Sequence, residues 1–493
     1  MSKFNEKLST SANASHPSYE GGSVFYKSSL NEWLNILLSS KLQDGYYEDE
    51  DTIEGRFLDL TRTVIEISGP EFAAKSAMFA RREVGMRSTS ELVAAVLNEY
   101  KFEQKRSFYS KFFYRPDDVA EVFAAVDMLG GKKSHGLLKG ASNYLSTLNA
   151  YQLTKYKLTS HKYSMYSLID LTHPKSVYID DFCNHRLSKP ETWEVLISSC
   201  RDENDKALRW KYLVDNRKLG YLALIRNLRN VVRSVSSIES DFYRWIESTL
   251  CHQVEDNESI LKSLVWPYQI YTAYRSFDSE ADISFLLINS LHKAFYSSCK
   301  NLPSLPGKTL AVLDVSGSMN CPYTTTLSIV DTCASYLAGF LAADSDLDVV
   351  KFGTNCRKFV CPTYIDSNSM DVIYKLTNND NCGYSTNIVS VFEYLIDNKL
   401  SYDSILLFSD MQVMGDRSCV QGFSATRYNF DKYKKTCGKS HIYSFDLGNY
   451  SDQIVSKDTD ITYLTAINPS AFKLISLGDY ENVKAYVESY NKK

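Results

Sequence analysis

Residues 309–319 have the sequence TLAVLDVSGSM, an apolar run that ends in a polar turn. A continuous apolar run rich in Val and Leu is typical of a strand buried on both faces of a parallel sheet. The turn that follows has the pattern Asp-x-Ser-x-Ser, formed by Asp314, Ser316 and Ser318. We therefore predict a central strand with a cluster of oxygen atoms at its carboxyl end.

The sequence around this strand indicates an α/β domain. Further strands are predicted at 347–352, 404–408 and 441–445, and helices at about 323–343, 387–397 and 478–491. Strands and helices that alternate at this spacing favour a doubly wound parallel sheet. Residues 303–308, PSLPGK, are typical of a linker. We therefore predict that the α/β domain spans residues 309–493.

Oxygen-bearing residues follow other predicted strands of this sheet. Ligands of doubly wound sheets bind at the carboxyl ends of the strands. We expect Thr386 and Asp410 to join Asp314, Ser316 and Ser318 there. Oxygen ligands without His or Cys suit Mg²⁺ or another hard divalent cation and not zinc. The alternative is that the two serines only cap the next helix.

The part of the chain before the linker is predicted to be helical. Apolar residues recur there at three- and four-residue spacing, as in 92–97 and 119–126, and alternating strand patterns are scarce. Many short helices favour a HEAT-like array of helical repeats over residues 21–302, although no strict sequence period is present. Residues 1–20 are polar and rich in Ser and Asn, and we predict a flexible arm.

The overall composition indicates a globular protein of the cytoplasm. The 493 residues are 44% hydrophobic and 23% charged, and the net charge is -4. Before residue 306, basic and acidic residues are equal in number, so an RNA-binding surface must be a local patch. The 11 cysteines include no C-x-x-C pair, which favours reduced thiols. The sequence has no signal peptide pattern and no apolar run of about 18 residues.

One local patch carries basic residues only. Between residues 130 and 163, four tyrosines, Tyr144, Tyr151, Tyr156 and Tyr163, are interleaved with Lys132, Lys133, His135, Lys139, Lys155, Lys157, His161 and Lys162. Cationic side chains contact phosphates, and aromatic rings stack on unpaired bases. The patch therefore predicts RNA binding. The alternative is a solvated basic face whose tyrosines pack inward.

Two further sets of arginines allow two interpretations each. Arg81, Arg82 and Arg87 are either a second RNA contact or partners of nearby acids on a helix surface. Arg226 and Asn227 lie within an apolar helix, and we favour a structural hydrogen-bonding role for them.

The α/β domain resembles the von Willebrand A domain and its metal-ion-dependent adhesion site. The resemblance implies that Asp314, Ser316, Ser318, Thr386 and Asp410 hold Mg²⁺ or another divalent cation, and that an acidic group from outside completes its shell. The threonine loop of that family is commonly Gly-Gly-Thr. Here Tyr384-Ser385 precede the threonine, and this bulkier loop can shift Thr386 or narrow access to it.

The helical part resembles the TROVE module of the Ro ribonucleoprotein family. Matching stretches occur in the family's order, at Gly21-Gly22, 56–58, 77–87, 167–174, Trp193-Glu194 and 222–230. The resemblance implies a ring of helical repeats closed by the A domain. It also implies binding of single-stranded 3′ ends of misfolded RNA in the ring, and of Y-like small RNA on the outer basic face.

The combined interpretation is a non-catalytic, monomeric RNA-binding protein that serves as a scaffold or a quality-control factor. Cleavage is then left to a partner such as an exoribonuclease. The alternative is a protein-interaction scaffold without RNA, whose A domain grips an acidic residue of a partner through Mg²⁺. A metal-dependent hydrolase is less favoured, because no His lies close in sequence to the three loops.

Overall fold

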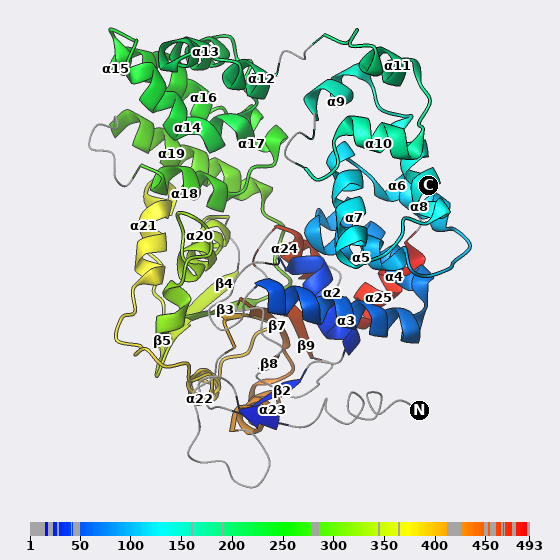
Figure 1. Cartoon of the computed structure of the whole chain (residues 1–493). Coiled ribbons are helices and arrows are strands. Elements are labelled where there is room, and N and C mark those ends of the chain that lie inside the picture. Colours follow the sequence, from blue (N-terminus) through cyan, green and yellow to red (C-terminus); the bar gives the residue numbers. More distant parts are fainter. Residues whose placement is uncertain are drawn as a thin grey trace.

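The computed structural model describes most of the chain, with helices before residue 302 and a helix-covered sheet after it (Figure 1). The described residues are 15–17, 23–26, 29–40, 42, 50–156, 158, 161–188, 192–277, 285–343, 346–362, 365–411, 425–447, 452–453, 460–464, 467, 469–475 and 480–490. Among these residues, no helix is both long enough and apolar enough to cross a membrane.

The first helical group runs from α2 to α11. Its elements are α2 (Ser29–Ser39), α3 (Glu50–Ser68), α4 (Pro70–Phe79), the π-helical turn η1 (Ala80–Val84), α5 (Ser88–Leu97), α6 (Lys105–Phe112), α7 (Pro116–Met128), α8 (His135–Leu145), α9 (Ala150–Lys155), α10 (Met165–Thr172) and α11 (Val177–Cys183). Proline occupies the first turn of α4 and α7, where its missing N–H has no helical partner to lose. The Ser134 hydroxyl caps α8 by accepting from the Leu137 nitrogen.

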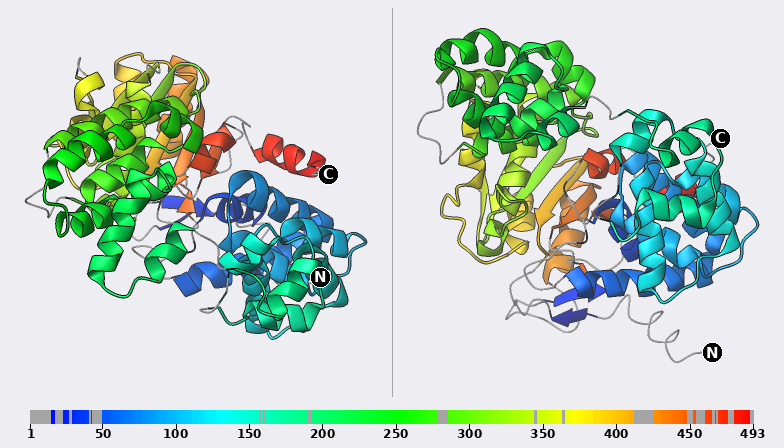
Figure 2. Two further views of the ribbon diagram at one scale, coloured as in Figure 1. Left: turned by 90° about the horizontal axis from the view of Figure 1, so that it is seen from above. Right: turned by 45° about the horizontal axis from the view of Figure 1, so that its top comes forward.

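The second helical group runs from α12 to η3. Its elements are α12 (Trp193–Ser198), α13 (Glu203–Asp215), α14 (Tyr221–Ser236), α15 (Phe242–Trp245), η2 (Ile246–Cys251), α16 (His252–Val254), α17 (Asn257–Ser263), α18 (Pro267–Arg275), α19 (Phe285–Ser298) and η3 (Cys299–Asn301). The two groups lie on opposite sides of the molecule in the views of Figures 1 and 2. This succession of short, stacked helices confirms the predicted helical architecture.

The sheet domain follows. Its strands are β3 (Thr309–Asp314), β4 (Leu347–Phe352), β5 (Cys356–Lys358), β6 (Ser404–Ser409), β7 (His441–Asp446) and β9 (Ile461–Leu464), in the spatial order β5-β4-β3-β6-β7-β9. Neighbouring strands are parallel except for the β4–β5 pair. The remaining elements are η4 (Gly317–Asn320), α20 (Ile329–Ala342), α21 (Ile365–Thr377), α22 (Val389–Asp397), α23 (Ala425–Cys437), α24 (Pro469–Ile475) and α25 (Tyr480–Ser489).

The two faces of the sheet are buried in different cores. Along β3, Ala311 and Leu313 belong to the core shared with α20, α21, α24 and the helical groups, whereas Leu310 and Val312 belong to a core shared with α22 and α23. Successive side chains of a strand point to opposite faces, so a strand covered on both faces must be apolar throughout. This explains the continuous apolar run and confirms the predicted doubly wound parallel sheet.

The arc of helices closes into a ring because both of its ends contact the sheet domain. At one end, α18 packs against α20, and α19 packs against α20 and α21. At the other end, α2 contacts β9 and α24, and α25 packs on α4. Figures 1 and 2 show the C-terminal helix α25, in red, beside the blue helices of the first group.

A small second sheet joins the N-terminal residues to the sheet domain. Strands β1 (Ser15–Pro17) and β2 (Ser23–Tyr26) form an antiparallel pair, and β2 pairs with β8 (Asp452–Gln453). The polar arm predicted for residues 1–20 therefore differs from the structure at residues 15–17, which form a strand. Backbone pairing with β2, which is itself held by β8, gives these residues an order that their composition alone does not predict.

Candidate functional site

Asp314 lies at the centre of the predicted metal site. It ends β3, and its side chain is fully buried. Its Oδ1 accepts a hydrogen bond from the Ser316 nitrogen at 2.9 Å, and its Oδ2 accepts one from the Ser409 hydroxyl at 2.7 Å. Ser409 ends the adjacent parallel strand β6, so Asp410 follows at the same edge of the sheet. The Ser316 and Ser318 hydroxyl oxygens lie 3.4 Å apart in the same turn.

The two carboxyl groups of this site repel each other. Burial, followed by the negative charge of Asp410, raises the pKa of Asp314, and the hydrogen bonds from Ser409 and Ser316 counteract only part of that rise. Asp410 is itself buried. A cation placed between two buried carboxylates offsets both the repulsion and the cost of burying charge. The electrostatics of the site therefore suit a cation.

Backbone and amide hydrogen bonds hold the threonine loop against the turn after β3. The Gly317 nitrogen donates to the Tyr384 carbonyl at 3.1 Å, and the Asn379 side-chain amide donates to the Val315 carbonyl at 3.1 Å. Thr386 is buried, whereas the Tyr384 side chain is 76% exposed and packs against little of the protein. The tyrosine that replaces glycine in this loop thus projects outward.

These contacts bring the turn after β3, the end of β6 and the threonine loop to one edge of the sheet. The threonine loop lies between α21 and α22, so the prediction that Thr386 follows a strand is wrong. Across the described residues, no group of three or more His, Cys, Asp or Glu side chains converges on a metal position. The candidate ligands are therefore two carboxylates and three hydroxyls, an oxygen set that fits Mg²⁺. Metal binding by Asp314, Ser316, Ser318, Thr386 and Asp410 stays a prediction.

The three predicted arginine contacts lie at the junction of α4 and α7. Arg81 is buried and donates to both Asp118 oxygens, at 2.7 and 2.9 Å. Arg87 donates to Asp117 at 3.0 Å. Arg82 donates through Nε to the Lys111 carbonyl at 3.0 Å. Arg87 also lies 3.6 Å from Glu91 of the next helical turn, as the alternative of pairing with nearby acids predicts. Arg81 differs from both interpretations, because it is buried and pairs with an acid of another helix.

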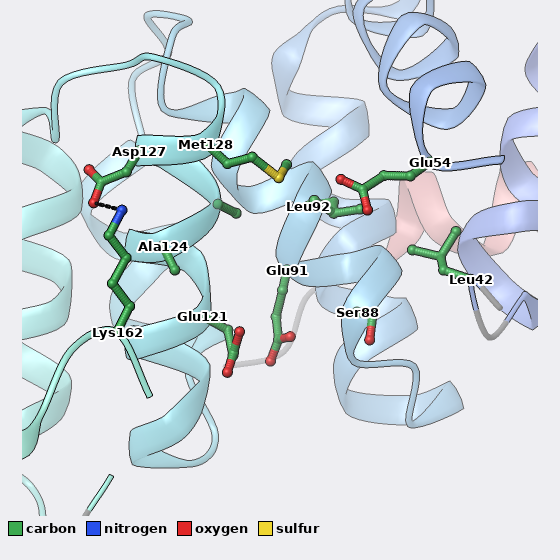
Figure 3. Close-up of a pocket in the computed structure, with 11 residues that line it drawn as sticks. Leu42, Glu54, Ser88, Glu91, Leu92, Glu121, Ala124, Asp127, Met128 and Lys162 are labelled. Atoms are coloured by element: carbon green, nitrogen blue, oxygen red, sulfur yellow. Dashed lines mark ion pairs between the residues drawn. The ribbon is translucent and has the colours of Figure 1, made fainter. Parts of the chain in front are cut away.

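Part of the predicted basic patch is neutralised by acids from α7. Lys133 forms a short ion pair with Asp127, and Lys162 lies 2.9 Å from the same carboxylate (Figure 3). His161 Nδ1 lies 2.7 Å from Glu121. The linear sequence shows one kind of charge in the patch because these acids come from a helix that precedes it.

The pocket beside Lys162 is acidic. Glu54, Glu91, Glu121 and Asp127 line it together with Lys162 (Figure 3). Burial, followed by the nearby Asp118 charge, raises the pKa of Glu91. The other carboxylates, those of Glu54, Glu121 and Asp127, repel phosphate, so the pocket side of the patch is a poor surface for RNA.

A second part of the patch is exposed. Lys132, His135 and Lys139 are exposed, and His135 and Lys139 lie one turn apart on α8. Arg106 of α6 is exposed beside them and donates to the Asn143 amide oxygen at 3.2 Å. Within the described part of the chain, none of these four basic side chains forms an ion pair with a carboxylate. This set of four residues is named the α6–α8 face below.

Arg106 was not among the predicted residues. It joins the others because α6 and α8 cross at close range, and a side chain at Gly140 would meet Tyr109 Cβ at 2.4 Å. The Gly136-x-x-x-Gly140 spacing, which places both glycines against α6, is the sequence signal that could have indicated this crossing.

The remaining predicted residues are dispersed. Lys155 lies 3.6 Å from Glu194 of α12 and spans the junction of the two helical groups. Lys157 lies outside the described residues. Tyr144 is buried, whereas Tyr151 is 47% exposed.

Comparison with known proteins identifies part of the second helical group. The TROVE domain model matches residues 184–283, which extend from just before α12 to just beyond α18. Telomerase protein component 1 of Rattus norvegicus is 31% identical over 93 residues, and that of Mus musculus is 32% identical over 93 residues. In each case the match covers 19% of this chain and 3% of the relative, so the chain spans a small fraction of these relatives.

A solved structure matches nearly the whole chain. The crystal structure of the RO (RSR) protein of Deinococcus radiodurans superposes with a TM-score of 0.62 at 14% identity, covering 93% of this chain and 99% of that one. The chain therefore has the fold of this Ro protein, and residues 184–283 match the TROVE domain. This confirms the predicted ring of helical repeats closed by an α/β domain, and the TROVE match supports the predicted family resemblance.

Within the matched TROVE segment, α14 carries the predicted pair Arg226 and Asn227. The Asn227 side-chain amide donates to the Ala223 carbonyl at 2.9 Å, one turn earlier in the same helix. Arg226 is exposed. The local hydrogen bond of Asn227 agrees with the structural role that we favoured for it, whereas the exposure of Arg226 leaves its guanidinium accessible.

Proposed function

We propose that this chain is a non-catalytic RNA-binding protein of the Ro type. The observation that carries the proposal is the α6–α8 face, where Lys132, His135, Lys139 and Arg106 are exposed without ion pairs among the described residues. Unpaired surface cations bind the phosphate backbone and release its counterions, and this release drives most of the electrostatic affinity.

The α6–α8 face lies on the first helical group, and we assign to it a small non-coding, Y-like RNA. The ring would take the single-stranded 3′ ends of misfolded RNA. Such a protein acts as a scaffold or a quality-control factor and leaves cleavage to a partner exoribonuclease. A local patch of this kind also accounts for RNA binding by a chain whose helical part has no net positive charge.

A salt titration of RNA binding tests this assignment. The probe is a structured RNA with a single-stranded 3′ tail, and the test variant combines Lys132→Glu, Lys139→Glu and Arg106→Glu. Each lost phosphate contact lowers the slope of log K against log salt by about 0.7 to 0.9. We therefore expect the triple variant to reduce the slope by about 2 to 3 and to weaken binding strongly at low salt.

A matched triple variant controls for the change in net charge. Lys432, Lys435 and Lys439 are exposed on or just after α23 of the sheet domain, so Lys432→Glu, Lys435→Glu and Lys439→Glu change the total charge equally. This control should bind RNA like the unmodified protein. An equal loss of RNA affinity in both triple variants would show that the net charge, and not the α6–α8 face, determines RNA binding. No binding by the unmodified protein would refute the proposal.

The second candidate function is metal-dependent docking of an acidic partner, and the buried Asp314–Asp410 pair favours it. Asp314, Ser316, Ser318, Thr386 and Asp410 would hold Mg²⁺, which would supply an open coordination position for a carboxylate of the partner. The protein residues would orient the ion and exclude water from it. This function is compatible with RNA binding on the helical groups, because it uses a different part of the molecule.

Manganese binding tests this second function without a known partner. Mn²⁺ replaces Mg²⁺ at oxygen sites, and its free-ion paramagnetic resonance signal disappears on binding. We expect one saturable Mn²⁺ site in the unmodified protein and none in Asp314→Ala. The same weak binding in both proteins would exclude the site as a metal centre.

A further inference from the structure

The ring has three junctions, and the polypeptide chain passes through two of them. Residues between α11 and α12 connect the two helical groups, and residues 302–309 connect the second group to the sheet domain. The junction between the sheet domain and the first helical group, named the closing seam here, is held by non-covalent contacts of β8, β9, α24 and α25 with residues 15–83. Because the chain is continuous elsewhere, the ring can open without unfolding a connecting segment at this junction.

The C-terminal helix α25 forms one half of the closing seam. The Phe79 ring of α4 lies 5.4 Å from the Tyr486 ring and 5.7 Å from the Tyr490 ring, edge-on to both. The Tyr490 hydroxyl donates to Glu83 Oε1 at 2.8 Å. The Lys75 ammonium donates to the Glu488 carbonyl. Aromatic pairs of this geometry hold surfaces together with moderate strength.

The N-terminal residues form the other half of the closing seam. Strand β2 adds to β8 through the register Phe25↔Gln453 and Tyr26↔Asp452, and α2 then contacts β9 and α24. Each end of the chain therefore reaches across the seam. The N-terminal hairpin lies on the sheet domain, and the C-terminal helix lies on the first helical group.

The junction with the second helical group contains a cluster of buried aromatic side chains. Tyr336 of α20 lies 5.7 Å from Trp266 and 5.2 Å from Phe472, and all three side chains are buried. A side chain at Gly339 would meet Pro267 of α18 at 2.9 Å, so the two helices are in close contact. By contrast, Tyr486 in the closing seam is 43% exposed. Val483 and Val487 of the same helix are buried, so the aromatic edge of α25 that contacts Phe79 is the solvent-accessible part of the closing seam.

We propose that the closing seam is a gate through which RNA without a free end enters the ring, and that α25 is its latch. The inference rests on the proposed function, because it requires that single-stranded RNA binds inside the ring. A linear RNA can thread its 3′ end through a closed ring. A covalently circular RNA cannot thread, so its capture inside the ring requires the seam to separate.

The test compares a circular single-stranded RNA with its linear form of the same sequence, using the full chain. Tyr486→Ala combined with Tyr490→Ala removes both rings that contact Phe79. We expect the capture rate of the circular RNA to rise about tenfold, in line with the loss of two aromatic contacts, while capture of the linear RNA stays unchanged. Tyr428→Ala, at a tyrosine of α23 that is 64% exposed, is the matched control and should change neither rate.

A second variant guards against a general loss of structure. Tyr490→Phe keeps the ring that packs on Phe79 and removes only the hydroxyl that donates to Glu83. It should raise circular-RNA capture less than the double variant does. Equal circular-RNA capture by the double variant and the unmodified protein, with linear RNA still bound, would overturn the gate.

Failure of the proposed function gives a different result, namely that neither RNA form binds. Backbone hydrogen exchange then decides whether the seam opens. If the seam opens, amides of α25 and α2 exchange faster than amides of α18 and α20, and the double variant widens the difference. Uniform exchange at both junctions would overturn the gate independently of RNA.

Discussion

The Arg81 guanidinium and the Asp118 carboxylate form an ion pair in the interior of the first helical group, in which one guanidinium nitrogen donates to both carboxylate oxygens. Arg81 Nη2 lies 2.7 Å from one oxygen and 2.9 Å from the other, and neither side chain has more than slight contact with solvent. Asp118 Oδ2 also accepts from the Tyr114 and Arg115 nitrogens at 2.8 and 2.9 Å. The pair therefore fastens the end of α4 and its π-helical turn to the start of α7.

Arg81→Ala is expected to destabilise the protein and to leave the RNA affinity of the folded protein unchanged. Removing one partner of a buried pair leaves an uncompensated charge, and the cost is about 3 to 5 kcal/mol of unfolding free energy. Urea denaturation measures this change, and RNA titration below the unfolding transition measures affinity. Arg106→Ala is the matched exposed variant, for which we expect an unchanged unfolding free energy and a lower RNA affinity. A stable Arg81→Ala protein with weak RNA binding would restore the contact interpretation of Arg81.

The close crossing of α6 and α8 predicts opposite effects for one substitution at two sites. Gly140→Ala places a methyl group 2.4 Å from Tyr109 Cβ and 3.0 Å from the Arg106 carbonyl, so the helices must separate. We expect Gly140→Ala to lower the unfolding free energy by about 1 to 3 kcal/mol. The methyl group that Gly55→Ala adds in α3 would have no neighbouring atom within 4 Å. This substitution should therefore stabilise the protein by about 0.5 to 1 kcal/mol. Thermal unfolding of both variants measures these two changes in stability. An unchanged stability of Gly140→Ala would contradict the close crossing of α6 and α8.

The Asp127 carboxylate predicts a pH dependence of stability. Burial alone raises its pKa, but hydrogen bonds from Lys133, Tyr163 and Lys162 outweigh burial and hold the pKa below its usual range. A carboxylate with a depressed folded-state pKa stabilises the fold above its ordinary pKa of about 3.9, and this contribution is lost as the pH falls below that value.

Asp127→Asn should therefore lower the unfolding free energy by about 1 kcal/mol at neutral pH, a figure reduced for the partial exposure of the group. The difference from the unmodified protein should shrink below about pH 4. Asp170→Asn, at an exposed position of α10, serves as the control and should show no pH-dependent difference. A difference for Asp127→Asn that stays constant down to acid pH would contradict the role given to the ion pairs.

The repulsion between Asp314 and Asp410 predicts a distinct response to metal. Asp410→Asn removes one of two buried negative charges, so it should stabilise the metal-free protein by about 1 kcal/mol. We expect Mg²⁺ to raise the Tm of the unmodified protein, since a ligand that binds the native state stabilises it, and we expect the variant to lose this rise. Thermal scans in EDTA and in excess Mg²⁺ measure both effects. A variant that still gains stability from Mg²⁺ would place the ion elsewhere.

The predictions from sequence were accurate where local pattern determines structure. The observed strands β3, β4, β6 and β7 coincide with the predicted ones to within a residue, because buried strands between helices have an unmistakable apolar pattern. The short edge strands β5 and β9 and the helices α21, α23 and α24 were not predicted. The helix expected from residue 323 begins at Ile329, because Ser328 supplies the capping box and Pro322 belongs to the preceding turn.

In the candidate sites too, local sequence pattern predicted some of the residues and tertiary contacts determined the others. Asp314 and Asp410 were predicted from their places after strands, which the parallel topology brings to one edge. Thr386 lies instead between α21 and α22, and the hydrogen bond from Gly317 to Tyr384 holds its loop at the same edge. The basic patch was only partly accessible to sequence reasoning, because the acids that pair with Lys133 and Lys162 lie on another helix. The carboxylates that Arg81 and Arg87 contact on α7 lie 37 and 30 positions away, and Arg106 joins Lys139 only through the helix crossing. Charge pairs between residues of different helices determine which of these basic side chains are accessible, and the composition does not encode such pairs.

The reciprocal placement of the two chain ends has a consequence for biosynthesis. Tyr490 and Glu83 are separated by 407 positions, and strand β2 waits for residues 452–453 before it can pair. A chain is synthesised from its N-terminus, so β2 and Glu83 remain without these partners until residues 452–490 have been made. Contacts of such long sequence separation also form slowly. Ring closure therefore cannot precede the synthesis of residues 452–490, and a nascent chain passes through an open form before it becomes a closed one.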